Sequence, residues 1–178
     1  PANAPLNDLM KDRLGVEFDE NGNLAATGKT DETILTRMFQ RPYFAQKPPK
    51  SLDRHDFHDA LTLVQNLSNA DAAATLTALP AACVAANQSH LTTQPKNWYI
   101  CGGGAQNPTL MQELASRLMG EIHPIESLNL DGDMLEAQAF AFLATRTLRA
   151  LPISAPSTTG CTTPTTGGQI ASPNSPPV

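Results

Sequence analysis

The chain has 178 residues, of which 40% are hydrophobic and 16% charged, with a formal net charge of −5 at pH 7. A chain of this size can bury a core, and the composition fits one globular domain, or one domain with a tail. The twelve Lys and Arg residues form no basic cluster, and no apolar run approaches the roughly 20 residues that span a bilayer, so neither a nucleic-acid-binding nor a membrane-embedded protein is expected.

The first part of the chain is predicted to be helical. Residues 3–15 are predicted to form a short helix that ends at Gly15, because Leu6, Leu9, Met10 and Leu14 make one apolar stripe at helical spacing. Residues 19–23 are typical of a turn. A second helix is expected to begin with Thr30 as its N-cap, because acidic residues follow it in the first turn. Its inward residues are expected to be Ile34, Leu35, Met38 and Phe39.

Two longer helices are predicted in the middle of the chain. A loop with three prolines covers residues 40–53, and a helix is expected over about 54–67. Another helix is expected to begin at Ser68 and to run to about Asn87 with an alanine-rich inner face. Pro80 falls inside this helix, removes one backbone hydrogen bond and should bend it.

The run from Asn97 to Pro108 is the most informative stretch. A short apolar strand leads into three consecutive glycines, and an Asn-Pro pair then opens an amphipathic helix over 109–118. Glycines are costly to order, and a strand–glycine turn–helix junction commonly seats a nucleotide. A tight structural turn is the alternative, since the run is neither G-x-G-x-x-G nor a Walker motif. The candidate nucleotide-binding residues are Gly102, Gly103, Gly104, Ala105 and Asn107.

A second strand over 121–125 and a last helix from Asp133 to about Leu151 complete the predicted elements. Asp133 and Glu136 match a capping box, whereas a functional interpretation places Glu136 at the edge of a cleft. The expected inward residues of this helix are Ala137, Phe140, Ala141, Ala144 and Leu148. From residue 152 the sequence is rich in Pro, Ser, Thr and Gly, which divides the chain into a domain over 1–151 and a strap or tail over 152–178.

Only two strands accompany five or six helices in this prediction. Two strands make a poor sheet by themselves. The domain is therefore either mostly helical or part of a sheet whose other strands lie outside this sequence.

Two further groups of residues are candidate sites. Lys50 and Ser51, in a Pro-Pro-Lys-Ser loop, could contact phosphate, although such a loop is more often a rigid exposed turn. His55 and His58 lie three residues apart beside acidic residues, where a solvated helix face is favoured over a metal site. No Ser-His-Asp or Cys-His pairing predicts a catalytic group, and the three distant cysteines favour a reducing cytoplasm.

Together these motifs resemble the C-terminal half of anhydro-N-acetylmuramic acid kinases. The matching features occur in the family's order and at similar spacing over nearly the whole chain, and Pro1-Ala2-Asn3 resembles the end of an Asp-Thr-Gly-Pro-(Gly/Ala)-Asn segment. The loop 49–55 departs from the family's Pro-Lys-Ser-Thr-Gly-(Arg/Lys)-Glu. The features that match the family are Pro48-Pro49-Lys50-Ser51, the Cys-Gly-Gly-Gly-Ala-x-Asn-Pro run at 101–108, and Asp133-x-x-Glu136-Ala137-x-x-Phe140-Ala141-x-Leu143-Ala144-x-Arg146.

The resemblance implies a mostly helical α/β fragment of an actin-like ATPase domain of the ribonuclease H-like type. Full members are about twice this length. Their phosphate-gripping Gly-Thr-Ser-x-Asp-Gly loop, most of the sugar site and the catalytic Asp would precede Pro1, so no catalytic residue is assigned within this chain and the fragment is expected to be inactive alone. The glycine run would contact adenosine, and Lys50, Ser51 and Glu136 would lie at the cleft edge.

The implied reaction converts 1,6-anhydro-N-acetylmuramic acid to N-acetylmuramic acid 6-phosphate in peptidoglycan recycling, with ATP and Mg2+. The implied partners are ATP and the anhydro-amino sugar, and a homodimer is left open. Two alternatives of another class remain: a helical interaction or scaffolding domain with a structural glycine turn, and a metal-binding helical protein that uses His55 and His58.

Overall fold

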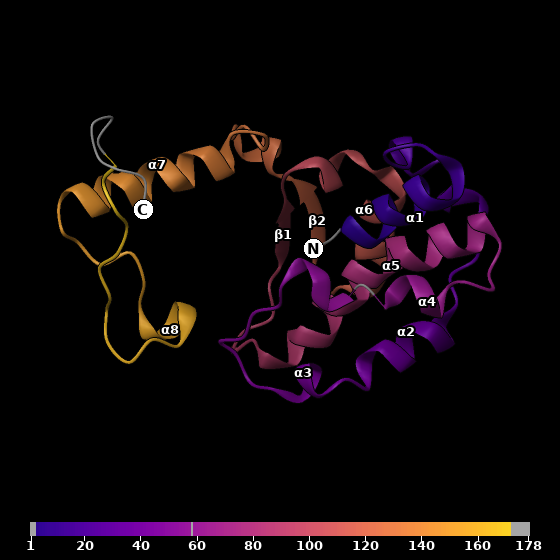
Figure 1. The fold of residues 1–178 in the computed structure, drawn as a ribbon, viewed down its shortest axis with the longest axis horizontal. Coiled ribbons are helices and arrows are strands. Elements are labelled where there is room, and N and C mark those ends of the chain that lie inside the picture. Colours follow the sequence, from indigo (N-terminus) through magenta and orange to yellow (C-terminus); the bar gives the residue numbers. More distant parts are fainter. Residues whose placement is uncertain (1–2, 58, 172–178) are drawn as a thin grey trace. The chain divides into compact units, whose positions relative to one another are not determined.

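The computed structural model describes residues 3–57 and 59–171 and divides into two compact units (Figure 1). Pro1–Lys47 and Leu52–Asp133 make up the first unit, and Pro48–Ser51 and Met134–Val178 make up the second. The domain boundary predicted at residues 151 and 152 stays a prediction.

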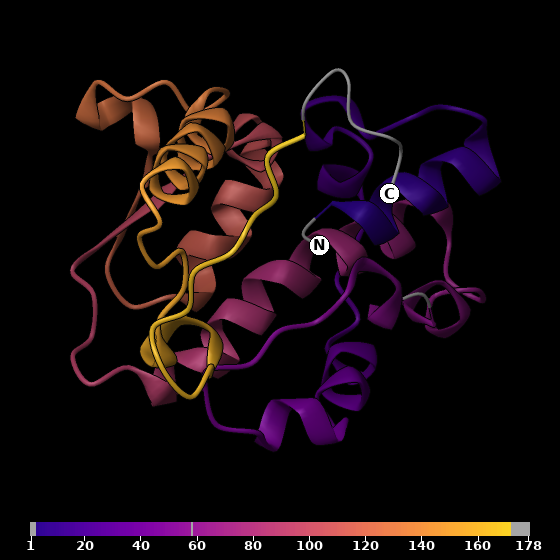
Figure 2. The ribbon, with the colours of Figure 1, turned by 60° about the vertical axis from the view of Figure 1, so that its left-hand side comes forward.

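The first unit holds six α-helices and a small sheet among its described residues. Helix α5, the longest, has a core of alanine and leucine in contact with α1, α2 and α6. Figures 1 and 2 both show α1 beside α5. The elements are α1 (Ala4–Leu14), α2 (Glu32–Phe39), α3 (Pro42–Ala45), α4 (Ala60–Leu63), α5 (Asn69–Asn87), β1 (Asn97–Ile100), α6 (Pro108–Arg117) and β2 (Glu121–Pro124), with 3-10 turns at Glu20–Gly22, Ala25–Thr27, Arg54–Phe57, Gln88–His90, Gly103–Gln106 and Ile125–Leu128.

The main core of the first unit forms around α5 because this helix is apolar on nearly every side. Leu76 and Ala78 are fully enclosed, and the neighbouring helices contribute Leu35 and Met38 of α2 and Leu9 of α1. A helix that is hydrophobic all round must be covered on all faces. Helix α5 therefore fixes the positions of the shorter helices.

The two strands that the sequence predicts at 97–101 and 121–125 are present and form a parallel sheet. Strand β1 pairs with β2 in the register Trp98 to Ile122, and α6 connects the two strands. Parallel neighbours need such a crossover. A second core cluster joins Ala81 of α5 and Leu110, Leu114 and Leu118 at α6 to the partly buried strand residues Trp98, Ile100 and Ile122.

Two predictions for the helices of the first unit are wrong in detail. The side chain of Asp31, not Thr30, caps α2 by accepting hydrogen bonds from the amides of Thr33 and Ile34 at 2.9 and 3.1 Å. The Thr30 hydroxyl instead faces the carbonyl of Ala74. The helix expected over 54–67 is a 3-10 turn followed by the single helical turn of α4, with residue 58 outside the described residues.

Helices α1, α5 and α6 agree with the sequence, whereas α3 lies within residues 40–53, which were predicted to form a loop. Helix α1 ends at Gly15 in the left-handed conformation, and the Ser68 hydroxyl caps α5. Pro80 lies within α5, which continues through it. The bend at Pro80 stays a prediction.

The second unit contains α7 (Leu135–Leu148) and α8 (Pro156–Thr159) in its described part. The segment after α7 folds back on itself, since Ser154 and Thr165 form an antiparallel bridge. The Thr147 hydroxyl donates to the Gly167 carbonyl at 3.0 Å, which ties this segment to α7. The segment after α7 is therefore attached to this helix near Thr147, and the description of residues 152–178 as a strap or tail stays a prediction.

Two expectations for α7 are wrong. Its N-cap is Met134, without a side-chain cap, and Asp133 lies outside the helix with its amide donating to Asp131 Oδ1, so Asp133 and Glu136 form no capping box. None of the residues of α7 is buried, and Phe140 is 64% exposed. An amphipathic pattern predicts a face that needs cover, but the described residues of the second unit leave this face largely open.

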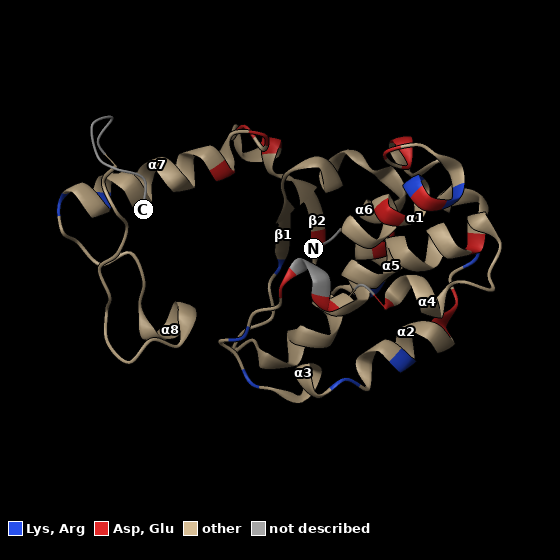
Figure 3. Ribbon diagram, in the orientation of Figure 1, with Lys and Arg blue, Asp and Glu red and all other residues tan. Residues whose placement is uncertain are grey.

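Charges are scattered over the ribbon (Figure 3). No basic stripe stands out on this ribbon among the described residues. Within the described residues, every helix is too short or too polar to cross a bilayer.

Candidate functional site

The glycine run forms a tight junction between β1 and α6. Gly102 has φ of +72°, a conformation that favours glycine, and its carbonyl accepts a hydrogen bond from the Ala105 amide at 2.9 Å. The 3-10 turn Gly103–Gln106 then delivers the chain to Asn107. The predicted strand–glycine turn–helix arrangement is therefore present.

Asn107 caps α6, and Pro108 occupies its first turn. The Asn107 side chain is 8% exposed, and its Oδ1 accepts a hydrogen bond from the Leu110 amide at 3.0 Å. Proline suits this position because the first amide groups of a helix have no partner within the helix, so the missing N–H of Pro108 costs no hydrogen bond. The Asn-Pro pair therefore fixes where the helix begins, and the positive end of the helix dipole lies at the glycine turn.

The three glycines have different surroundings. A Cβ built on Gly102 or Gly103 would meet no atom within 4 Å, whereas one on Gly104 would lie 3.1 Å from Leu110 Cδ2. Gly104 is thus packed against α6, and Gly103 borders open space. A backbone with open space above it is what close approach of a ligand requires.

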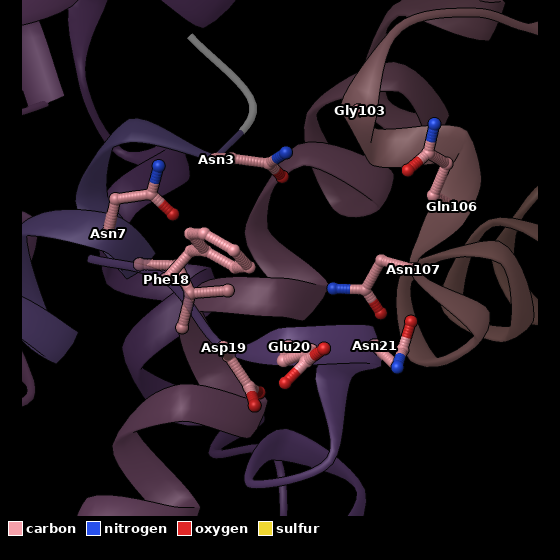
Figure 4. A pocket seen from close by; sticks show the side chains of 10 residues that line it. Asn3, Asn7, Phe18, Asp19, Glu20, Asn21, Gly103, Gln106 and Asn107 are labelled. Atoms are coloured by element: carbon pink, nitrogen blue, oxygen red, sulfur yellow. The ribbon is translucent and has the colours of Figure 1, made fainter. Parts of the chain in front are cut away.

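Gly103 also lines a pocket of about 480 Å³, which Figure 4 shows from close by. Pockets for small organic ligands commonly have this size. Three segments of the first unit surround it, and the lining residues are Asn3, Leu6 and Asn7 from α1 and its start, Phe18, Asp19, Glu20 and Asn21 from the turn that follows, and Gly103, Gln106 and Asn107 from the glycine junction.

The turn that carries Phe18 to Asn21 is fixed by hydrogen bonds. The buried carboxylate of Asp19 accepts from the amides of Leu24 and Ala25, each at 2.9 Å. The Thr109 hydroxyl of α6 donates to the Gly22 carbonyl at 2.9 Å. The turn is therefore attached to the same helix start that Asn107 caps.

Gly22 allows this attachment. Its φ is +67°, and a Cβ on it would lie 2.2 Å from Asn107 Oδ1 and 2.8 Å from the Thr109 side chain. No side chain fits there without displacing the cap. Glycine at this position lets the turn that carries residues 18–21 pack directly against the start of α6.

An ion pair holds the far end of α6. Arg117 donates to Glu113 at 2.9 Å and to Glu32 of α2 at 3.2 Å, with a second, shorter bond to Glu32. The hydrogen bond from the Arg117 guanidinium lowers the pKa of the Glu32 carboxyl. Both ends of α6 are thus tied to other parts of the first unit.

The pocket lining carries no positive charge in the described structure. Its ionisable side chains are those of Asp19 and Glu20, and its other polar groups are carboxamides. A triphosphate would require Lys, Arg or a metal ion. The lining suits the uncharged part of a ligand with hydrogen-bonding groups.

The predicted site residues divide between the two units. Gly103 and Asn107 line the pocket, while Gly102, Gly104 and Ala105 shape the junction beside it. Lys50, Ser51 and Glu136 belong to the second unit, and their role at a cleft edge stays a prediction.

The metal hypothesis remains untested at its histidines. His58 lies outside the described residues, as does the side chain of His55. In the part of the chain that the structure describes, no group of three His, Cys, Asp or Glu side chains could hold a metal ion.

Sequence reasoning missed most of the pocket. The sequence predicts only a turn for Glu20 and assigns no role to Phe18, and it marks none of Asn3, Asn7 and Gln106 as a site residue. Phe18 precedes Gly103 by more than eighty residues, and no spacing rule links such distant segments. A large aromatic residue beside an Asp-x-x-Gly turn was the one local feature that could have drawn attention to this segment.

Comparisons with known proteins agree with this structure. The family model described as anhydro-N-acetylmuramic acid kinase matches residues 1–173. Curated relatives of that name in Roseobacter denitrificans and Ruegeria sp. are each 50% identical over 173 residues, and one in Cereibacter sphaeroides is 53% identical over the same length. These alignments cover 97% of this chain but 46%, 46% and 47% of the relatives, so the chain spans about half their length. The chain belongs to the anhydro-N-acetylmuramic acid kinase family.

Proposed function

We propose that this chain is the adenosine-binding part of an ATP-dependent kinase that converts 1,6-anhydro-N-acetylmuramic acid to N-acetylmuramic acid 6-phosphate in peptidoglycan recycling. The observation that carries the proposal is the open space at Gly103, at a glycine junction that begins α6 and lines a 480 Å³ pocket. The family match supports the reaction.

The pocket fits a nucleoside better than a triphosphate. Its lining offers an aromatic ring, five carboxamides and two carboxylates, and no cation among the described residues. The proposal therefore assigns the phosphates, the sugar and Mg2+ mainly to the rest of the intact enzyme. None of this chain's residues receives a role in holding the metal ion.

The fold of the fragment supports the same assignment. A β–α–β unit with two parallel strands is a small piece of sheet. In an actin-like ATPase domain of the ribonuclease H-like type, further strands would extend this sheet. We propose that those strands belong to the rest of the intact protein, which would act in the cytoplasm.

The proposed reaction balances as one hydrolysis and one transfer. Water adds to the anomeric carbon, the bond between that carbon and O6 breaks, and O6 takes the γ-phosphoryl group while ADP leaves. An Asp outside this chain would accept the proton of the water. This chain would hold the adenosine so that the γ-phosphate lies near O6.

A kinase assay tests the proposal. The intact protein, incubated with γ-labelled ATP and 1,6-anhydro-N-acetylmuramic acid, is expected to release labelled N-acetylmuramic acid 6-phosphate. The 178-residue chain alone is expected to release none, because the groups assigned to the phosphates and to catalysis lie elsewhere. Absence of product from the intact protein would refute the proposed reaction, and turnover by the isolated chain would refute the division of roles.

A further inference from the structure

The wall of the pocket opposite the glycine junction contains an exposed aromatic ring. Phe18 is 58% exposed, and no ring contact of Phe18 occurs among the described residues. Figure 4 shows its ring toward the middle of the pocket, with Asn3 and Asn7 on one side and the turn 19–21 on the other. An apolar ring exposed inside a polar pocket offers a stacking surface.

The backbone that presents this ring is held in place. Asp19 uses both carboxylate oxygens on backbone amides, and Gly22 is held by Thr109 and packed against Asn107. Phe18 precedes this anchored turn by one residue. The backbone that carries Phe18 therefore has a defined position relative to Gly103, which reduces the ordering needed when a ligand enters.

The polar groups around the ring are suited to a nucleoside. Glu20 is exposed at the pocket. The backbone amides of Leu24 and Ala25 donate to the Asp19 carboxylate and not to that of Glu20. A carboxylate accepts hydrogen bonds from hydroxyl groups and repels phosphate. The amide nitrogen of Asn107 points into the pocket in Figure 4, because Oδ1 is used by the helix cap.

We infer that Phe18 stacks on the base of the bound nucleotide and that Glu20 accepts hydrogen bonds from its ribose hydroxyls. The inference rests on the proposed function and adds to it two specificity-determining residues from a segment far from the glycine run. Phe18 and the glycine junction then enclose the nucleoside from two sides. Gly103 provides close backbone approach, and Phe18 provides the apolar contact.

Calorimetric titration of the intact protein tests the role of Phe18. Phe18→Ala is expected to weaken ATP binding about tenfold, the size of a lost base–aromatic contact, while Phe18→Trp retains it. Binding of inorganic tripolyphosphate is expected to stay the same in both variants. Val16→Ala, an exposed apolar residue of the same segment outside the pocket lining, is the matched control and should bind ATP as the wild type does.

The role of Glu20 is tested with 2′,3′-dideoxy-ATP. The wild type is expected to prefer ATP over this analogue about tenfold, and Glu20→Ala is expected to lose the preference because the acceptor of the hydroxyls is gone. Glu17→Ala, which removes a nearby exposed carboxylate outside the pocket lining, should keep the preference.

The outcomes separate this inference from the proposed function. If Phe18→Ala binds ATP as tightly as Val16→Ala does, while Gly103→Val loses ATP, the inference is wrong and the proposed site stands. If none of these variants changes ATP binding, the nucleotide does not occupy this pocket and both fail. Loss of the anhydro-amino sugar instead of ATP, or a parallel loss of tripolyphosphate, would also overturn the assignment to the base.

Discussion

Replacing Gly103 by valine is expected to weaken ATP binding to the intact protein by at least about tenfold, or about 1.4 kcal/mol, while the protein stays folded. The φ of Gly103 lies outside the left-handed range, and no atom lies within 4 Å of a Cβ at this position. The free protein therefore accommodates the added side chain, which stands on the backbone that the ligand would approach. Calorimetric titration with ATP measures the affinity, and circular dichroism verifies the fold.

Gly103→Ala provides a graded comparison. A single methyl group fills less of the pocket, so its effect is expected to lie between those of the wild type and Gly103→Val. Unchanged ATP affinity in the valine variant would show that the glycine turn is purely structural, as the scaffolding alternative holds.

Gly22→Ala is expected to have the largest effect on stability, with a loss of about 2–3 kcal/mol in the free energy of unfolding. The new Cβ is strained by φ of +67° and overlaps the Oδ1 of Asn107, so it disturbs the cap of α6 as well. Because the two pocket walls meet at this contact, ATP affinity should fall too. Urea unfolding and calorimetry measure the two effects.

Gly15→Ala is the matched control for this variant. Gly15 has φ of +70°, but a Cβ there would meet nothing within 4 Å. It should lose only the cost of the left-handed conformation, about 1 kcal/mol, and should bind ATP normally. Equal losses at Gly15 and Gly22 would contradict the tight joint between the turn and α6.

Local patterns in the sequence identified the elements that depend on local chemistry. Asn107 and Pro108 marked the beginning of α6, Gly15 marked the end of α1, and the apolar runs gave both strands. These features depend on residues within one turn of each other. The same reasoning chose Thr30 where Asp31 is the cap, because neighbouring polar residues have similar capping tendencies.

Contacts between distant segments could not be found in this way. Phe18 and Gly103 line one pocket only because Thr109 and Gly22 join their segments. A hydrophobic period shows which face of a helix needs cover but not what covers it. Helix α7 illustrates the point, since its predicted inward residue Leu148 is 69% exposed.

The motif at Asp133 and Glu136 was misinterpreted for a related reason. The pattern Asp-x-x-Glu fits a capping box in sequence, but the helix begins two residues after Asp133. The Asp133 amide bonds to Asp131, which draws this residue into the preceding turn. A capping box requires the helix to start at the right residue, and sequence spacing alone does not establish that.

Photolabelling tests most directly the central claim that the glycine junction and the turn before it hold the nucleoside. The intact protein, irradiated with 8-azido-ATP and digested, is expected to carry the label on peptides that contain residues 18–21 or 103–107, and excess ATP should suppress the labelling. Label confined to peptides outside these two segments, equally suppressed by ATP, would contradict the assignment of the nucleoside to this pocket.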